Sequence, residues 1–167
     1  LINTYNYGLF ASLKIVYFEI LGLITYKNIN EFKLVEDKNT SYLKSKTKKK
    51  YNTAYIPTPY YFLFLIKEYL IKKKILKFNF IDLGCGYSRP ANYLNKYFNI
   101  NYIGIDINRD IINSFKSNKN FKFYSLDLRN KKKFFKIINN YFNSGKNIFF
   151  LSDPFDINLT NDILKVA

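Results

Sequence analysis

The sequence predicts an α/β protein in which a parallel sheet has helices on both faces. Two observations lead to this prediction. From residue 77 onward, short apolar segments alternate with segments of helical periodicity, and this alternation is typical of parallel sheets. The first apolar segment also ends in Asp82 and runs directly into a glycine-rich turn, Gly84-Cys85-Gly86. Such sheets bind ligands at the carboxyl ends of their strands.

Four strands and three connecting helices are expected in this part of the chain. The strands are expected at residues 77–83, 101–106, 121–126 and 147–152. The helices between them are expected at residues 89–98, 108–118 and 130–143, with a further helix starting near 158. Gly145 lies in a polar segment that fits a helix stop and a turn into the fourth strand.

N-terminal helices are expected before the sheet. Residues 8–26 are apolar except for Lys14 and Glu19, and their length approaches the ~20 residues of a membrane span. Two charges near the middle favour instead an amphipathic helix that packs on the domain or lies on a membrane surface. Residues 27–53 are polar and rich in lysine, which indicates a linker.

A second N-terminal helix is expected from Tyr60 to Ile71. Thr58 is the expected N-cap, with Pro59 at the first helical position. We therefore divide the chain into residues 1–53, an amphipathic helix with a lysine-rich linker, and residues 54–167, the ligand-binding domain.

The composition sets bounds on the class of function. The chain has 27 basic and 12 acidic residues and a net charge of +15, which suits nucleic acid or another anionic partner. Only three of the basic residues are arginines. Arginine is the preferred residue for bidentate phosphate contacts, so a compositional bias toward lysine explains the charge better.

Cys85 is the only cysteine, and the chain has no histidine. A single cysteine forms no internal disulfide and no cysteine-based metal site, so a cytoplasmic location and no metal are expected. Without a histidine to act as its base, the Cys85 thiol is not expected to be catalytic.

The predicted site contains a second acid, at the end of the second strand. Asp106 follows Gly86 by 20 residues, about the offset at which nucleoside-binding folds place the carboxylate for the ribose hydroxyls. Arg89 stands where a dinucleotide site has its third glycine. Asp82, just before the glycines, suits a ligand with a positive ammonium or sulfonium group. An NAD-type site and a chance glycine turn between buried strands are the alternatives.

Residues 77–156 resemble the class I S-adenosylmethionine-dependent methyltransferases, whose first motif is D/E-x-G-x-G. The resemblance implies a Rossmann-like sheet with strand order 3-2-1-4-5-7-6, of which this sequence supplies strands one to four. Strand 147–152 would then lie at an edge, and the domain would be incomplete at its C-terminal side. Methionine is absent even at position 1, so we expect a fragment at both ends.

The resemblance also implies a role for each acid in binding S-adenosylmethionine. Asp82 would order the amino group of the methionine moiety, and Asp106 would bind the ribose hydroxyls. Asp127 would accept the adenine amine, or alternatively cap helix 130–143. Ile107 would line the adenine or pack in the core. The expected cofactor-binding residues are Asp82, Gly84, Cys85, Gly86, Asp106, Ile107 and Asp127, with the two glycines bringing backbone amides to the ligand.

The methyl acceptor is expected beside Asp153, Pro154 and Phe155, after the fourth strand. Ser152, Pro154 and Phe155 fit loosely the motif of enzymes that methylate amino groups of nucleic-acid bases. The segment 55–59 (Tyr-Ile-Pro-Thr-Pro) together with residues 153–155 also resembles a group of bacterial methyltransferases, some of them similar to protein-lysine methylating enzymes. The second resemblance covers more of the chain, so a protein amine or small molecule is favoured over nucleic acid.

The implied reaction is a direct in-line methyl transfer, in which Asp153 or Asp156 orients or deprotonates an amine acceptor. A rival interpretation is a nucleotide-binding module without transfer chemistry.

Overall fold

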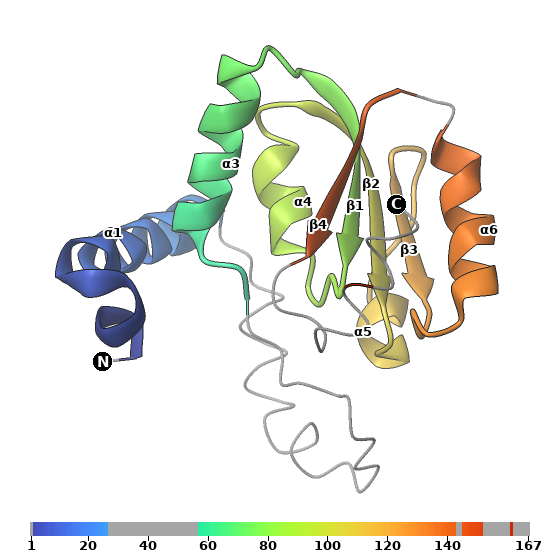
Figure 1. The fold of residues 1–167 in the computed structure, drawn as a ribbon, viewed down its shortest axis with the longest axis horizontal. Coiled ribbons are helices and arrows are strands. Elements are labelled where there is room, and N and C mark those ends of the chain that lie inside the picture. Colours follow the sequence, from blue (N-terminus) through green and yellow to red (C-terminus); the bar gives the residue numbers. More distant parts are fainter. Residues whose placement is uncertain (1, 27–56, 143–144, 152–160, 162–167) are drawn as a thin grey trace, which may run out of the picture.

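A computed structural model of the protein describes residues 2–26, 57–142, 145–151 and 161. The predicted α/β fold with a parallel sheet is confirmed. The strands pair in the order β3-β2-β1-β4, and every pairing is parallel, so their arrowheads all point downward in Figure 1. The strands are β1 (Lys77–Leu83), β2 (Asn99–Asp106), β3 (Phe121–Ser125) and β4 (Asn147–Leu151).

The helices differ from the prediction mainly in length. Phe98 closes a turn after α4 by donating to the Leu94 carbonyl, because its buried side chain enters the core one residue before β2 begins. After α5 the Asn118 side chain accepts the N–H groups of Asn120 and Phe121 and starts β3. The helices are α1 (Ile2–Tyr26), α3 (Tyr60–Lys72), α4 (Arg89–Leu94), α5 (Arg109–Asn113) and α6 (Lys131–Phe142).

Several predicted features lie outside the described residues. They are the linker at residues 27–53, the boundary between residues 53 and 54, and the helix expected near residue 158.

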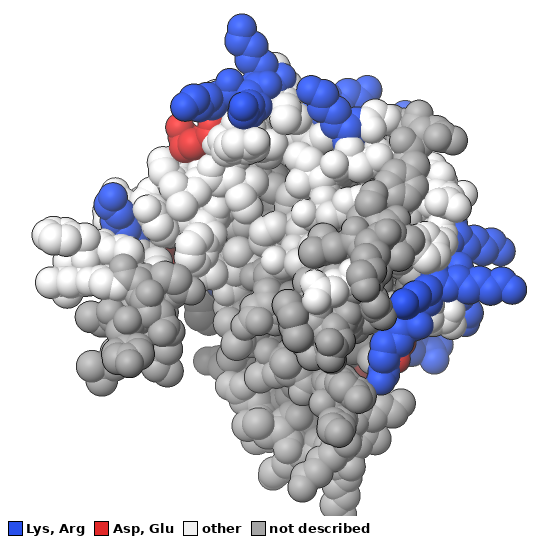
Figure 2. Space-filling view, in the orientation of Figure 1, with Lys and Arg blue, Asp and Glu red and all other residues white. Residues whose placement is uncertain are grey.

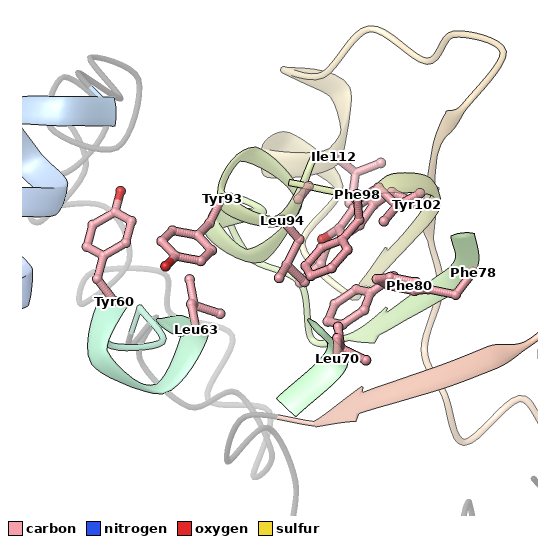
Figure 3. Close-up of a cluster of buried hydrophobic side chains, with 13 residues drawn as sticks. Tyr60, Leu63, Leu70, Phe78, Phe80, Tyr93, Leu94, Phe98, Tyr102 and Ile112 are labelled. Atoms are coloured by element: carbon pink, nitrogen blue, oxygen red, sulfur yellow. The ribbon is translucent and has the colours of Figure 1, made fainter. Parts of the chain in front are cut away.

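Helices cover both faces of the sheet, as predicted. On one face α3, α4 and α5 enclose a largely aromatic core with the side chains of β1 and β2. Figure 3 shows Phe80 and Tyr102 in this core, and their rings stack with centroids 6.1 Å apart. On the other face α6 packs Phe134 and Ile138 on the aliphatic side chains of β1 and β2. β1 is buried on both faces from Phe78 to Leu83, and its polar residues Asn79 and Asp82 are buried with its apolar ones.

A row of asparagines crosses the sheet at the amino ends of its strands. Asn79 in β1 stands in register with Asn101 in β2 and Asn147 in β4. The Asn101 amide donates to the Asn79 side-chain oxygen at 2.9 Å, and the Asn79 amide donates to that of Asn147 at 2.8 Å. These bonds satisfy a buried polar side chain and favour this register over a shifted one.

Helix α1 packs on the N-terminus of α3 through Glu19. The predicted N-cap of α3 is wrong: the helix begins at Tyr60, its N-cap is Pro59, and no side chain of the capping residue bonds to it. Instead the Glu19 carboxylate accepts the Tyr60 N–H at 2.5 Å. A carboxylate from another helix thus satisfies an end that favours negative charge.

The same carboxylate holds Arg89, the first residue of α4. The Arg89 guanidinium donates to Glu19 at 2.7 Å and to the Thr58 carbonyl at 3.1 Å, and it lies 4.5 Å from the centre of the Tyr60 ring. Gly22 lets α1 approach closely, because a Cβ there would lie 2.2 Å from the Tyr60 ring. Among the helices that the structure describes, none combines the length and apolar character needed to cross a bilayer.

Candidate functional site

The candidate site lies at the carboxyl ends of β1 and β2. The chain moves from β1 to β2 and β3 on one side and returns to place β4 on the other side of β1. Ligands of such sheets bind outside the strand ends where the order reverses. The loop of residues 84–88 follows β1 at this point, and Asp106 ends the neighbouring strand.

The glycines of this loop allow its sharp turn. Gly84 and Gly86 have φ angles of +79° and +47°, a region that side chains disfavour. Their amides are used within the chain: the Gly84 N–H donates to the Ile105 carbonyl at 2.8 Å, and the Gly86 N–H donates to Asp106 at 2.9 Å. These amides were expected to reach a ligand. In this structure they instead fix the loop to β2.

Asp106 ties the loop to the start of the next helix. One carboxylate oxygen accepts the Gly86 N–H and the other accepts the Asn108 N–H at 2.8 Å. Burial raises the pKa of Asp106, and the backbone N–H groups oppose that rise. A carboxylate has about four lone-pair positions, so Asp106 keeps capacity to accept hydrogen bonds from a ligand.

Asp82 lies beneath the loop, with 2% of its surface exposed. Its carboxylate accepts the Tyr102 hydroxyl at 2.5 Å. Burial raises the pKa of Asp82 to about 7, the nearby Asp106 charge adds to the rise, and the Tyr102 hydrogen bond opposes it. The Asp82 carboxyl group therefore changes charge near neutral pH, and it lies on the buried side of the loop.

Gly104 makes the approach of Tyr102 to Asp82 possible, and sequence reasoning missed both residues. Gly104 is the register partner of Asp82. A Cβ at Gly104 would lie 2.9 Å from both the Cys85 sulfur and the Tyr102 ring. The space above Gly104 is thus filled by these two side chains. An isolated glycine within a strand signals such a close approach, and it was visible in the sequence.

Cys85 packs inside the loop, as predicted. Its side chain is buried, and burial raises the pKa of the thiol, with the Asp82 charge adding to the rise. The thiol therefore stays protonated at neutral pH. Ser88, three residues on, adopts a left-handed backbone with φ +56° and caps α4 with no side-chain bond. The guanidinium of the next residue, Arg89, is held by Glu19 and Thr58.

Ile107 follows Asp106 and is 41% exposed. The alternative that it packs in the core is therefore wrong.

Asp127 lies at the outer end of the site, after β3. It is half-exposed and forms a bidentate ion pair with Arg129, whose Nε lies 2.8 and 3.0 Å from the two carboxylate oxygens. Asn130 takes the capping role at α6, because its side chain accepts the Lys133 N–H at 3.2 Å. Asp127 is thus a half-exposed acid that is already paired with a cation.

The predicted acceptor residues Asp153, Pro154 and Phe155, together with Ser152 and Asp156, lie outside the described residues. The strand that leads to them is in place, since Leu151 at the end of β4 stands in register with Leu83 at the end of β1.

Comparison of the chain with protein-family models, curated proteins and solved structures finds no match in any of the three.

Proposed function

We propose that this chain binds S-adenosylmethionine at the loop of residues 84–88 and transfers its methyl group to an acceptor. The observation that carries the proposal is the placement of Asp82 and Asp106 at the ends of adjacent parallel strands, with Gly86 between them bonded to Asp106. The strand order β3-β2-β1-β4 equals the first four positions of the order expected for class I methyltransferases, which supports a Rossmann-like sheet of that class.

The donor set fits this cofactor. Asp106 has acceptor capacity left after its two backbone bonds and would take the ribose hydroxyls, which are donors. Asp82 brings a second acid below the same loop, and its ionised form would stabilise the cationic part of the ligand. Two acids at one loop oppose a pyrophosphate group through charge repulsion, which disfavours NAD and similar dinucleotides.

The bound cofactor would supply a methyl group that its sulfonium already activates. The protein's task is therefore to orient the ligand and the acceptor. Ile107, exposed beside Asp106, would lie along the adenine, and Asp127 would accept the adenine amine after giving up part of its bond to Arg129. Asp153, Pro154 and Phe155 remain the proposed acceptor side, with a protein amine or small molecule favoured over a nucleic-acid base.

A cytoplasmic location belongs to the same proposal, because the single thiol, Cys85, is free and buried.

Calorimetric titration of the full chain with S-adenosylmethionine and S-adenosylhomocysteine tests the proposal. We expect saturable binding that Asp106→Ala weakens by at least about 100-fold, since hydrogen bonds to a charged group contribute about 1.5–3 kcal/mol each. The variant Asp106→Asn keeps a side-chain oxygen that can accept the Gly86 N–H and removes the charge, so it separates the effect of the charge from that of the loop contact. Asp110→Ala, an exposed acid in the next helix, is the matched control and should bind like the wild type.

Circular dichroism establishes that each variant is folded. A folded wild-type chain that ignores both ligands would overturn the proposal. Competition by NAD at similar concentration would support instead the nucleotide-binding module without transfer chemistry.

A further inference from the structure

Helix α1 presents a large apolar face to solvent. Its inner side packs on α3 through Phe18, Glu19 and Gly22. Its outer side carries eight large apolar side chains that are between 44% and 81% exposed. We call this set the outer stripe; its members are Leu9, Phe10, Leu13, Val16, Tyr17, Ile20, Leu21 and Ile24.

The outer stripe is continuous. Its members recur at intervals of three and four residues, so at 3.6 residues per turn they cover a sector roughly 140° wide along the helix. In Figure 2 the surface of α1, at the left, is mostly white. Both sides of α1 are therefore apolar, and only the inner one is covered by the part of the chain that the structure describes. Contiguous apolar surface of this kind marks an interaction site.

The charges of α1 are arranged in a way that favours an anionic partner. Glu19 is the only acid of the helix, and it is turned inward to Tyr60 and Arg89. Lys14 is the only basic residue of the helix, and it is exposed. The outer stripe therefore carries no negative charge, and the whole chain carries a net charge of +15.

We propose that the outer stripe docks on the surface of an anionic lipid bilayer, with α1 lying in the interface. Aromatic and aliphatic side chains enter the boundary between headgroups and acyl chains, while basic residues are attracted to anionic headgroups. The aromatic members Phe10 and Tyr17 suit this boundary. The proposal does not depend on the proposed methyl transfer.

A second copy of the chain is a less suitable occupant of the same face. Two copies would each bring a charge of +15, and their mutual repulsion opposes association at moderate ionic strength. The same charge attracts the chain to an anionic membrane. Nucleic acid is a less suitable occupant of this face, because its contacts with proteins go mainly to phosphate and sugar and leave the apolar side chains of the outer stripe uncovered.

Flotation of the full chain with lipid vesicles tests the proposal. We expect binding to vesicles of phosphatidylcholine mixed with phosphatidylserine, weaker binding to phosphatidylcholine alone, and a decrease as salt is raised. The double variant Phe10→Asn with Ile24→Asn should lower the partition coefficient by at least about tenfold, given the apolar area removed. The control pair Leu76→Asn with Tyr97→Asn changes exposed apolar residues elsewhere and should leave it unchanged.

A second measurement reports the position of the helix. Because the chain has no tryptophan, Tyr17→Trp places a single fluorophore in the outer stripe, and Tyr97→Trp places one outside it. A blue shift on anionic vesicles is expected for the first variant only.

Three results would overturn the proposal. They are a wild-type chain that does not float, equal losses in the two double variants, and a lipid-free dimer, detected by analytical ultracentrifugation, that the substitutions Phe10→Asn and Ile24→Asn abolish. The last result would assign the face to a second copy.

Discussion

The end of β1 and β2 differs from the end of β3 in how each treats its acids. At the first, Asp82 and Asp106 are largely withdrawn from water and bonded to Tyr102, Gly86 and Asn108. At the second, Asp127 is half-exposed and paired with Arg129, two residues away. The first region keeps two acids away from water, which is unfavourable for their charged forms. The acid of the second region stays partly in contact with water.

This difference supports the proposed ligand site at the ends of β1 and β2. Burial raises the pKa of both Asp82 and Asp106, and raised pKa values at a loop beside a strand end are typical of functional sites. An exposed ion pair such as Asp127–Arg129 forms in many proteins with little effect on stability. Changes at the first region should therefore have large effects on stability and binding, and changes at the second should have small ones.

The largest effect is expected from Asp82→Asn. The pKa of Asp82 rises from 3.8 in the unfolded chain to about 7 in the folded one. The folded state therefore binds the proton more tightly, and the wild type loses stability as pH rises from about 4 to 7. Between pH 5 and 8 the free energy of unfolding of the wild type should fall by about 3 kcal/mol relative to that of Asp82→Asn. Urea denaturation at the two pH values measures this change.

Tyr102→Phe is the companion variant for that experiment. It keeps the ring in the core and removes the hydrogen bond that lowers the pKa of Asp82. Its stability should fall over a wider pH range than that of the wild type, because the higher folded-state pKa of Asp82 extends the loss to higher pH. Parallel pH profiles for the wild type and Asp82→Asn would show that Asp82 does not titrate in this range.

Binding of S-adenosylmethionine by Asp82→Asn should weaken, because its charge is gone.

The next effect is expected from Gly104→Ala. The new methyl group would lie 2.9 Å from the Cys85 sulfur and the Tyr102 ring and 3.0 Å from the Phe123 ring. Overpacking of this kind costs about 1–3 kcal/mol, and here it also pushes Tyr102 away from Asp82. Gly145→Ala is an instructive control, because the structure places no neighbour within 4 Å of its Cβ and only the backbone, at φ +127°, resists the change.

Thermal unfolding and calorimetric binding of both glycine variants separate the two causes. Gly104→Ala should lose stability and weaken ligand binding, whereas Gly145→Ala should lose stability alone. Equal loss of binding in both variants would mean that Gly104 contributes only to the general stability of the sheet.

The alternation of strands and helices and the acids at the strand ends were predictable from sequence, because burial on both faces of a parallel sheet leaves a clear apolar pattern. The lengths of α4 and α5 were not, since Phe98 and Asn118 end them through tertiary packing and a turn. The capping of α3 by Glu19 was equally hidden: the carboxylate comes from 41 residues away, and no local rule connects the two.

The partnership of Asp82 with Tyr102 was hidden for a related reason. Their contact depends on the register of β1 with β2, which places Gly104 opposite Asp82. The alternating pattern identifies strands and does not fix which residues face each other. Strand-end acids can thus be found from sequence, while the groups that set their pKa values require the paired sheet.

The smallest effects are expected at the end of β3. Arg129→Ala removes a pair whose side chains are 44% and 37% exposed, so stability should change by less than about 1 kcal/mol. If Asp127 accepts the adenine amine, the same variant releases it from Arg129, and ligand binding should stay within about threefold of the wild type or tighten. Asp127→Asn should weaken binding by less than about tenfold, far less than Asp106→Ala. A loss of 2 kcal/mol or more in the stability of Arg129→Ala would mean that the pair is structural, and the two strand ends would then differ less than their burial indicates.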